Sequence, residues 1–118
     1  MPPTIGIDIV EIERLRNALE RFGTRFERRI FSEKEMEYFT KKMNPIQSMA
    51  GRFAVKEAFM KAKGRFLPWR EIEVLHEDRR PFVLFHGTRY RSVSISHERR
   101  YAVAVVVIEE DEHEDSCT

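Results

Sequence analysis

The chain has 118 residues and a mass of 14.1 kDa, a size that suits one small globular domain spanning 1–118. With 42% hydrophobic and 35% charged residues, its composition fits neither a disordered nor a fibrous protein. Its apolar run at 101–108 is far shorter than the ~20 residues that span a bilayer, and the N-terminus lacks a signal-peptide pattern, which predicts a cytoplasmic protein without membrane association. The single cysteine, Cys117, excludes an internal disulfide and a cysteine-based metal site.

The net charge of +1 conceals an uneven distribution. Residues 109–118 hold six of the 20 acidic residues and no lysine or arginine, which predicts a flexible acidic tail. The remaining body has 21 basic and 14 acidic residues, a formal charge of +7. Six arginines lie within 14–30, and this concentration favours an anionic partner or substrate.

The first third of the chain predicts one strand followed by helices. Residues 4–10 are mostly β-branched and apolar, as in a short strand. From Glu11 to Arg21 the apolar residues keep helical spacing, and Gly23 ends this run. Residues 26–31 then predict another short helical turn.

Two further helices are marked by their end signals. Ser32 and Glu35 form a capping-box pattern that opens a helix through about Lys42. The longest periodic segment is 46–63, and Gly64 is suited to close it as a C-cap.

The pattern changes to a period of two after Pro68. Segments 72–76 and 82–85 predict one hairpin, and 92–97 with 101–109 predict a second strand pair. The order of elements predicts an α+β fold, in which helices pack against a small antiparallel sheet.

Three charged residues are candidates for chemistry, although each also has a plain structural explanation. Asp8 interrupts an apolar strand, where burying an unpaired carboxylate is costly. It is therefore expected to lie at an exposed edge, to form a salt bridge with an arginine, or to bind a metal ion. Glu57 and Lys61 form an i,i+4 pair, which by itself indicates a solvated salt bridge on a helix surface.

Three segments together carry more information than any of these residues alone. They are GIDIVEI at 6–12, GRFAVKEAFMKA at 51–62 and SISH at 94–97. In this order and spacing the chain resembles the holo-acyl-carrier-protein synthase family, the small bacterial 4'-phosphopantetheinyl transferases. The resemblance extends from Gly6 to about Ile108. It implies a trimer of small α+β subunits, with the coenzyme A site between neighbours.

The resemblance also implies the reaction. The 4'-phosphopantetheine arm of coenzyme A passes to a serine of apo acyl carrier protein in fatty acid biosynthesis, and adenosine 3',5'-bisphosphate is released. Asp8 and Glu57 match the family's Mg²⁺ carboxylates, in keeping with the preference of Mg²⁺ for a few carboxylates plus substrate phosphates. Lys61 matches the motif lysine beside the diphosphate. The base that accepts the serine proton is either a carboxylate near the metal or a water.

Further residues receive binding roles from the same resemblance. The implied coenzyme A contacts are Arg52, Lys56, Lys61 and His97, although Arg52 also suits a structural salt bridge. The implied carrier-protein contacts on the first helix are Arg14, Arg21, Arg25, Phe26 and Arg29, which otherwise form a solvated face. The other histidines, His76, His86 and His113, match no motif and are expected to be packed or surface residues.

One stretch departs from the family pattern. The family usually has a glycine-rich segment after the long helix, whereas this chain reads KGRFLPWREIEV at 63–74, with a single glycine. Arg65 is a candidate to replace the missing backbone contacts by charge.

Two functions from other classes compete with this interpretation. The +7 body and 13 aromatic residues suit a nucleic-acid-binding module, although no RNA-binding aromatic signature or recognition-helix pattern is present. A non-catalytic domain that binds carrier protein is the other alternative.

Overall fold

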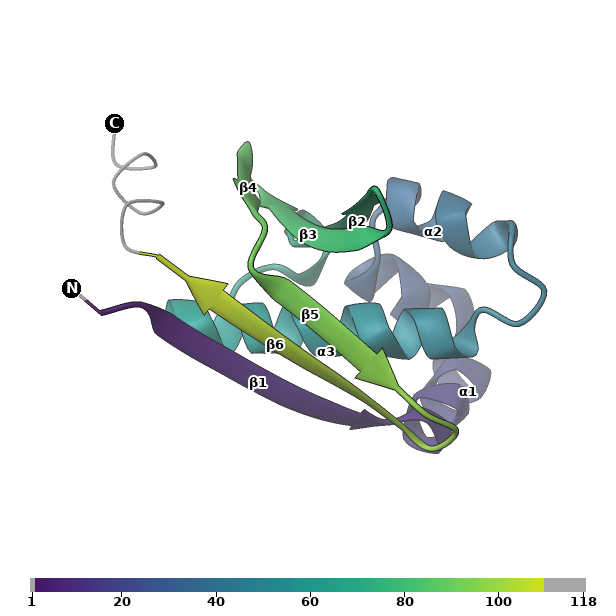
Figure 1. Cartoon of the computed structure of the whole chain (residues 1–118). Coiled ribbons are helices and arrows are strands. Elements are labelled where there is room, and N and C mark those ends of the chain that lie inside the picture. The colour runs from purple at the N-terminus through teal and green to yellow at the C-terminus, as the bar shows by residue number, and fades with distance from the viewer. Residues whose placement is uncertain (1, 110–118) are drawn as a thin grey trace.

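The computed structural model describes residues 2–109 and contains three α-helices and six strands within them (Figure 1). In chain order the elements are β1 (Thr4–Glu11), α1 (Ile12–Ile30), α2 (Glu33–Thr40), α3 (Ile46–Lys63), the short 3₁₀ helix η1 (Trp69–Glu71), β2 (Glu73–Glu77), β3 (Arg80–Phe85), β4 (Thr88–Tyr90), β5 (Val93–His97) and β6 (Tyr101–Ile108). The predicted α+β class is confirmed. The predicted acidic tail lies outside the described residues beyond Glu109.

The larger sheet joins the two ends of the described chain. Its strand order is β1-β6-β5, all antiparallel, with Thr4 opposite Ile108 and Glu11 opposite Tyr101. Helix α3 crosses one face of this sheet (Figure 1). On β1 the side chains alternate: Val10 is buried toward α3, whereas Ile7 and Ile9 are exposed on the opposite face.

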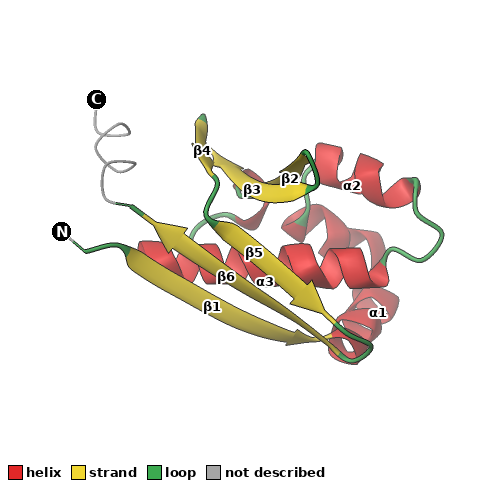
Figure 2. Cartoon of the chain, in the orientation of Figure 1, coloured by secondary structure: helices red, strands yellow, loops and turns green. Residues whose placement is uncertain are grey.

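The smaller sheet has the order β2-β3-β4 and lies beside α2 (Figure 2). The predicted hairpin of β2 and β3 is confirmed, with Asp78 and Arg79 both at positive φ in its two-residue turn. His86 and Gly87, also at positive φ, form a second tight turn into β4. The sequence analysis did not predict β4, which has three residues.

The helix boundaries follow from local signals. Gly23 (φ 60°, ψ −139°) kinks α1, so the predicted helix and the helical turn after it form two arms of one element. The capping box of Ser32 and Glu35 is present at the start of α2. Gly64 ends α3 in the left-handed conformation at φ 79°. No helix within residues 2–109 is long and apolar enough to cross a bilayer.

Candidate active site

Gly6 brings β1 unusually close to α3. A Cβ atom at this position would lie 1.8 Å from the backbone oxygen of Ala58, so no larger residue fits without moving the strand or the helix. Asp8 follows two residues later and therefore lies on the same face of β1, toward α3. Glu57, adjacent to Ala58 in α3, faces it. The close approach at Gly6 is thus what places two carboxylates from distant parts of the sequence side by side.

Lys61 connects the same strand to the same helix. Its Nζ donates to Asp8 Oδ1 at 3.2 Å and to the backbone oxygen of Ile7 at 3.0 Å. The Asp8 side chain is only 11% exposed, and its Oδ2 is buried without a hydrogen-bond partner. Lys61 itself remains 57% exposed, so its ammonium group is accessible from solvent.

The environment of Glu57 disfavours its charged form. Burial first, and then a hydrogen bond with Asp8 and the Asp8 charge, raise the pKa of Glu57 to about 7, while Lys61 opposes this shift. Two carboxyl groups that share a site in this way are relieved when a cation binds between them. A buried oxygen with a free lone pair and a neighbouring carboxylate are a suitable donor set for a hard divalent cation.

Within residues 2–109 no group of three or more His, Cys, Asp or Glu side chains is arranged to hold a metal. Two carboxylates agree with the coordination habits of Mg²⁺, which commonly takes one or two from the protein and completes its shell with water and phosphate oxygens. Asp8 and Glu57 alone would therefore supply only part of a Mg²⁺ coordination shell.

Two pockets open from this carboxylate pair. One of about 400 Å³ is lined by Asp8 and Glu57 together with Arg14 and Phe26 of α1. The other, of about 330 Å³, is lined by Glu57, Lys61, Arg65, Phe66 and Trp69. The predicted protein-binding residues Arg14 and Phe26 thus border the carboxylates directly. Arg21, Arg25 and Arg29 lie further along α1 and are exposed.

Lys56 does not face either pocket, and its predicted contact with coenzyme A needs correction. Its side chain is fully buried and pairs with the equally buried Glu35 at 2.8 Å. Lys56 Nζ also donates to the backbone oxygens of Trp69 and Ile72, so each of its three protons has an acceptor. Lys56 therefore links α2, α3 and the η1 segment and has no donor left for a nucleotide.

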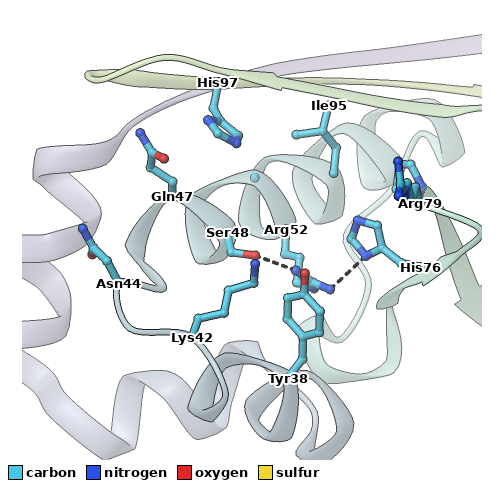
Figure 3. A pocket seen from close by; sticks show the side chains of 12 residues that line it. Tyr38, Lys42, Asn44, Gln47, Ser48, Arg52, His76, Arg79, Ile95 and His97 are labelled. Atoms are coloured by element: carbon cyan, nitrogen blue, oxygen red, sulfur yellow. Dashed lines mark hydrogen bonds between the residues drawn. The ribbon is translucent and has the colours of Figure 1, made fainter.

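A third pocket, of about 400 Å³, contains neither carboxylate in its lining, and Figure 3 shows its side chains from close by. Arg52 and His97 line it, as do Lys42, His76 and Arg79, and none of the described residues in its wall is acidic. We call it the cationic pocket. Arg52 precedes Glu57 by five residues, a rotation of roughly 140° around the helix axis. The cationic pocket and the carboxylate pair of one chain therefore point in different directions.

Sequence reasoning did not assign Lys42, His76 or Arg79 to a site. His76, expected to be a packed or surface residue, is exposed and also bonds to Arg52 at the cationic pocket. Lys42 lies in the loop after α2, His76 and Arg79 belong to the hairpin of β2 and β3, and none of the three matches a motif. His86 does behave as expected of a surface residue, paired with Glu71, and His113 lies outside the described residues.

Together the fold and the site define a small α+β protein with a buried carboxylate pair, an adjacent lysine and a separate pocket lined by cationic side chains. That combination is typical of enzymes that act on phosphate esters. Comparison with known proteins makes the assignment specific. The family model described as "4'-phosphopantetheinyl transferase superfamily" matches residues 4–106, and the chain belongs to this family.

Relatives cover nearly the whole chain. Holo-[acyl-carrier-protein] synthase of Chloroherpeton thalassium is 43% identical over 118 aligned positions, covering 91% of this chain and 98% of the relative. The protein of the same name from Chlamydia trachomatis is 41% identical, with 89% and 98% covered.

Solved structures of holo-acyl-carrier-protein synthases are also similar to this chain. The holo-(acyl-carrier-protein) synthase of Bacillus anthracis, in complex with CoA (3',5'-ADP), matches with a TM-score of 0.79 at 35% identity, covering 90% of this chain and 95% of that one. The Helicobacter pylori synthase in complex with coenzyme A matches with a TM-score of 0.77 at 32% identity, covering 89% and 99%.

Proposed function

We propose that this protein is a holo-acyl-carrier-protein synthase, which transfers 4'-phosphopantetheine from coenzyme A to a serine of apo acyl carrier protein and releases adenosine 3',5'-bisphosphate. The observation that carries the proposal is the pair of Asp8 and Glu57, bordered by Lys61 and by the arginine-bearing helix α1. Its named relatives are holo-acyl-carrier-protein synthases, and two related structures were solved with coenzyme A or its 3',5'-ADP portion.

The described side chains suit the steps of this reaction. Asp8 and Glu57 would hold Mg²⁺, which when bound supplies Lewis-acid stabilisation of the diphosphate. Lys61 lies beside the same position and would offset charge on the leaving phosphate. The serine oxygen forms the new bond to the phosphorus that carries pantetheine, and the bond from that phosphorus to the bridging oxygen breaks. The serine proton would go to a carboxylate near the metal position or to a water.

The arginines of α1 suit an acidic protein partner. Arg14 shares a pocket with Asp8 and Glu57, and Arg21 is exposed seven residues further along the helix, on the same face. Arg25, Phe26 and Arg29 extend this surface past the kink at Gly23. A carrier protein bound along α1 would deliver its serine to the carboxylate pair, with no need for nucleic acid or membrane.

An assembly of three copies would complete the site. The outer face of the larger sheet exposes Ile5, Ile7 and Ile9 by 65%, 58% and 62%, an apolar row that is costly to leave in water. Packing this face against neighbouring copies would bury it. It would also place the cationic pocket of one subunit beside the carboxylate pair of the next. Within one chain the cationic pocket and the carboxylate pair lie on different sides of α3 and cannot form a joint site.

The direct test is mass spectrometry of apo acyl carrier protein after incubation with this protein, coenzyme A and Mg²⁺. The expected result is a mass gain of one phosphopantetheine that depends on all three components. Binding of the carrier without a mass gain would instead identify a non-catalytic binding domain. A filter-binding titration with nucleic acid tests the remaining alternative, because phosphate-backbone binders lose affinity steeply with salt.

Lys61→Met keeps most of the side-chain volume but removes the charge. Loss of a positioned cation beside the diphosphate should cost about 2 to 4 kcal/mol of transition-state stabilisation, or roughly 30- to 1000-fold in kcat/KM. Steady-state kinetics with coenzyme A as the varied substrate measures this effect. The exposed Lys41→Met is the matched control and should retain normal kinetics. Wild-type kinetics for Lys61→Met would make Lys61 a surface salt-bridge residue.

Charge reversal on α1, in Arg14→Glu with Arg21→Glu, should raise the KM for carrier protein about tenfold or more and leave the KM for coenzyme A near normal, because rim charges set encounter rate and salt dependence. The wild type should lose activity as salt shortens the Debye length from ~10 Å toward ~3 Å, whereas the double variant should be nearly insensitive to salt.

The control for this variant is the same charge change elsewhere, in Arg80→Glu with Arg89→Glu on the smaller sheet, which should leave the carrier KM unchanged. An equal rise in KM for both substrates, or an unchanged salt slope in the α1 variant, would exclude α1 as the carrier-binding surface.

A further inference from the structure

The guanidinium of Arg52 is held by partners on three of its nitrogens. Nε donates to the backbone oxygen of Val74 at 3.0 Å, Nη1 to Ser48 Oγ at 2.9 Å, and Nη2 lies 3.0 Å from His76 Nδ1. Two of these partners, Val74 and His76, belong to β2, whereas Ser48 lies one turn earlier in α3. The Arg52 residue is only 3% exposed, although it lines the cationic pocket (Figure 3).

Tyr38 of α2 supports both groups with its ring. The Arg52 Cζ atom lies 4.1 Å from the centroid of the Tyr38 ring, and the His76 ring stacks on Tyr38 at 5.9 Å with an interplanar angle of 8°. Guanidinium and imidazole therefore meet against one aromatic surface, which restricts rotation of both.

The bond to His76 also defines the state of its ring. A guanidinium nitrogen can only donate, so His76 Nδ1 must accept, and the proton of the neutral ring is on Nε2. Burial, together with the charges of Arg52 and Lys42, lowers the pKa of His76, in agreement with a neutral ring. These three bonds leave one N–H donor on Nη1 and one on Nη2, and the Tyr38 hydroxyl also lies within hydrogen-bond reach of the guanidinium.

A rigid guanidinium whose two terminal nitrogens each keep an N–H that is not bonded to Ser48 or His76 suits a phosphate that bears two or more terminal oxygens. The diphosphate of coenzyme A must lie at the carboxylate pair, where its bond breaks, so it is not the group that enters this pocket. The remaining phosphate of coenzyme A is the monoester on its ribose. Lys42 and Arg79 add charge around the same space, which a hydroxyl group would not require.

We propose that His76 is a positioning residue that fixes the Arg52 guanidinium and thereby makes the enzyme select coenzyme A over dephospho-coenzyme A. The inference rests on the proposed function. His76 acts through Arg52 and needs no contact with the reacting atoms, so its removal should weaken recognition of the monoester without slowing chemistry.

The test compares two substitutions with opposite expectations. His76→Phe keeps the stack on Tyr38 but removes the acceptor, whereas His76→Asn places an acceptor oxygen near the Nδ1 position. For His76→Phe we expect a rise in the KM for coenzyme A of about tenfold with kcat within about twofold, as for loss of a hydrogen bond to a charged group. The KM for dephospho-coenzyme A should stay unchanged. His76→Asn should restore most of the selectivity.

Controls keep the outcome interpretable. His86→Asn, at an exposed turn of the same sheet, should behave as wild type. If His76→Phe does not fold, Tyr38→Leu removes the shared ring surface and should give the same loss of selectivity. Equal effects on both nucleotides, wild-type selectivity in either variant, or failure of His76→Asn to restore it would overturn the inference. If the wild type itself transfers nothing, the proposed function fails instead. If it transfers from both nucleotides equally well, only the role of His76 fails.

Discussion

Asp8→Asn and Glu57→Gln should each reduce phosphopantetheine transfer by about 1000-fold or more, because each removes half of the charge that the chain offers to a metal between β1 and α3. An amide retains the size of the carboxyl group but is a far weaker ligand for Mg²⁺. Initial rates across a Mg²⁺ titration measure the effect. Glu37→Gln, an exposed residue of α2, is the matched control and should retain the wild-type rate.

The same variants should not unfold the protein, and the effect of Glu57→Gln on stability should depend on pH. The folded-state pKa of Glu57, about 7, lies above the ordinary value of 4.5, so ionisation of this carboxyl opposes folding. Below pH 4.5 Glu57 is protonated in both the folded and the unfolded state, so its ionisation costs no stability. The loss of stability develops between the two pKa values and is complete above pH 7.

Without metal, the Tm of Glu57→Gln should therefore exceed that of the wild type at pH 8, and the difference should shrink as the pH falls below the pKa of about 7. Excess Mg²⁺ at pH 8 should raise the Tm of the wild type alone. Near-normal turnover of either variant at saturating Mg²⁺ would show that the substituted residue is not a ligand.

Most of the fold could be predicted from local signals. The capping box at Ser32 and Glu35 and the C-cap at Gly64 each operate within one turn of chain, and the structure confirms both. Strand β4 was not predicted because its three residues are too few to show a period-two pattern. The turn at His86 and Gly87 before it is the local feature that could have indicated a further strand. The pairing of β1 with β6 joins the two ends of the described chain and depends on tertiary packing.

The site was less predictable because α3 is buried on several sides at once. Lys56 and Glu57 are neighbours in a family motif, yet one is fully buried in an ion pair and the other faces the carboxylate site. Helical spacing distinguishes an exposed face from a buried one, but it does not identify which of several buried faces holds a ligand. The resemblance brought Asp8, Glu57 and Lys61 into one hypothesis, and the close approach at Gly6 is the physical reason that they meet.

The remaining large effect is expected at the outer face of the β1-β6-β5 sheet. Ile7→Asp places a charge at the middle of the apolar row, opposite Val105, where burial against another copy would leave the carboxylate unpaired. Ile7 is 58% exposed in the single chain, so the subunit itself should still fold. We expect the proposed trimer to dissociate and transfer to fall by about 100-fold or more, since each site would lose the cationic pocket that a neighbour is proposed to supply.

Light scattering coupled to gel filtration, run alongside the transfer assay, measures both parts of this expectation. Met43→Asp, which is fully exposed outside the sheet, is the matched control and should leave mass and activity unchanged. Because dissociation obeys mass action, raising the concentration of Ile7→Asp should recover specific activity as trimers re-form. A monomeric Ile7→Asp with full activity would show that one chain holds a complete site, despite the different directions in which Arg52 and Glu57 point. An unchanged trimer would show instead that the apolar row of β1 is not the surface that joins the subunits.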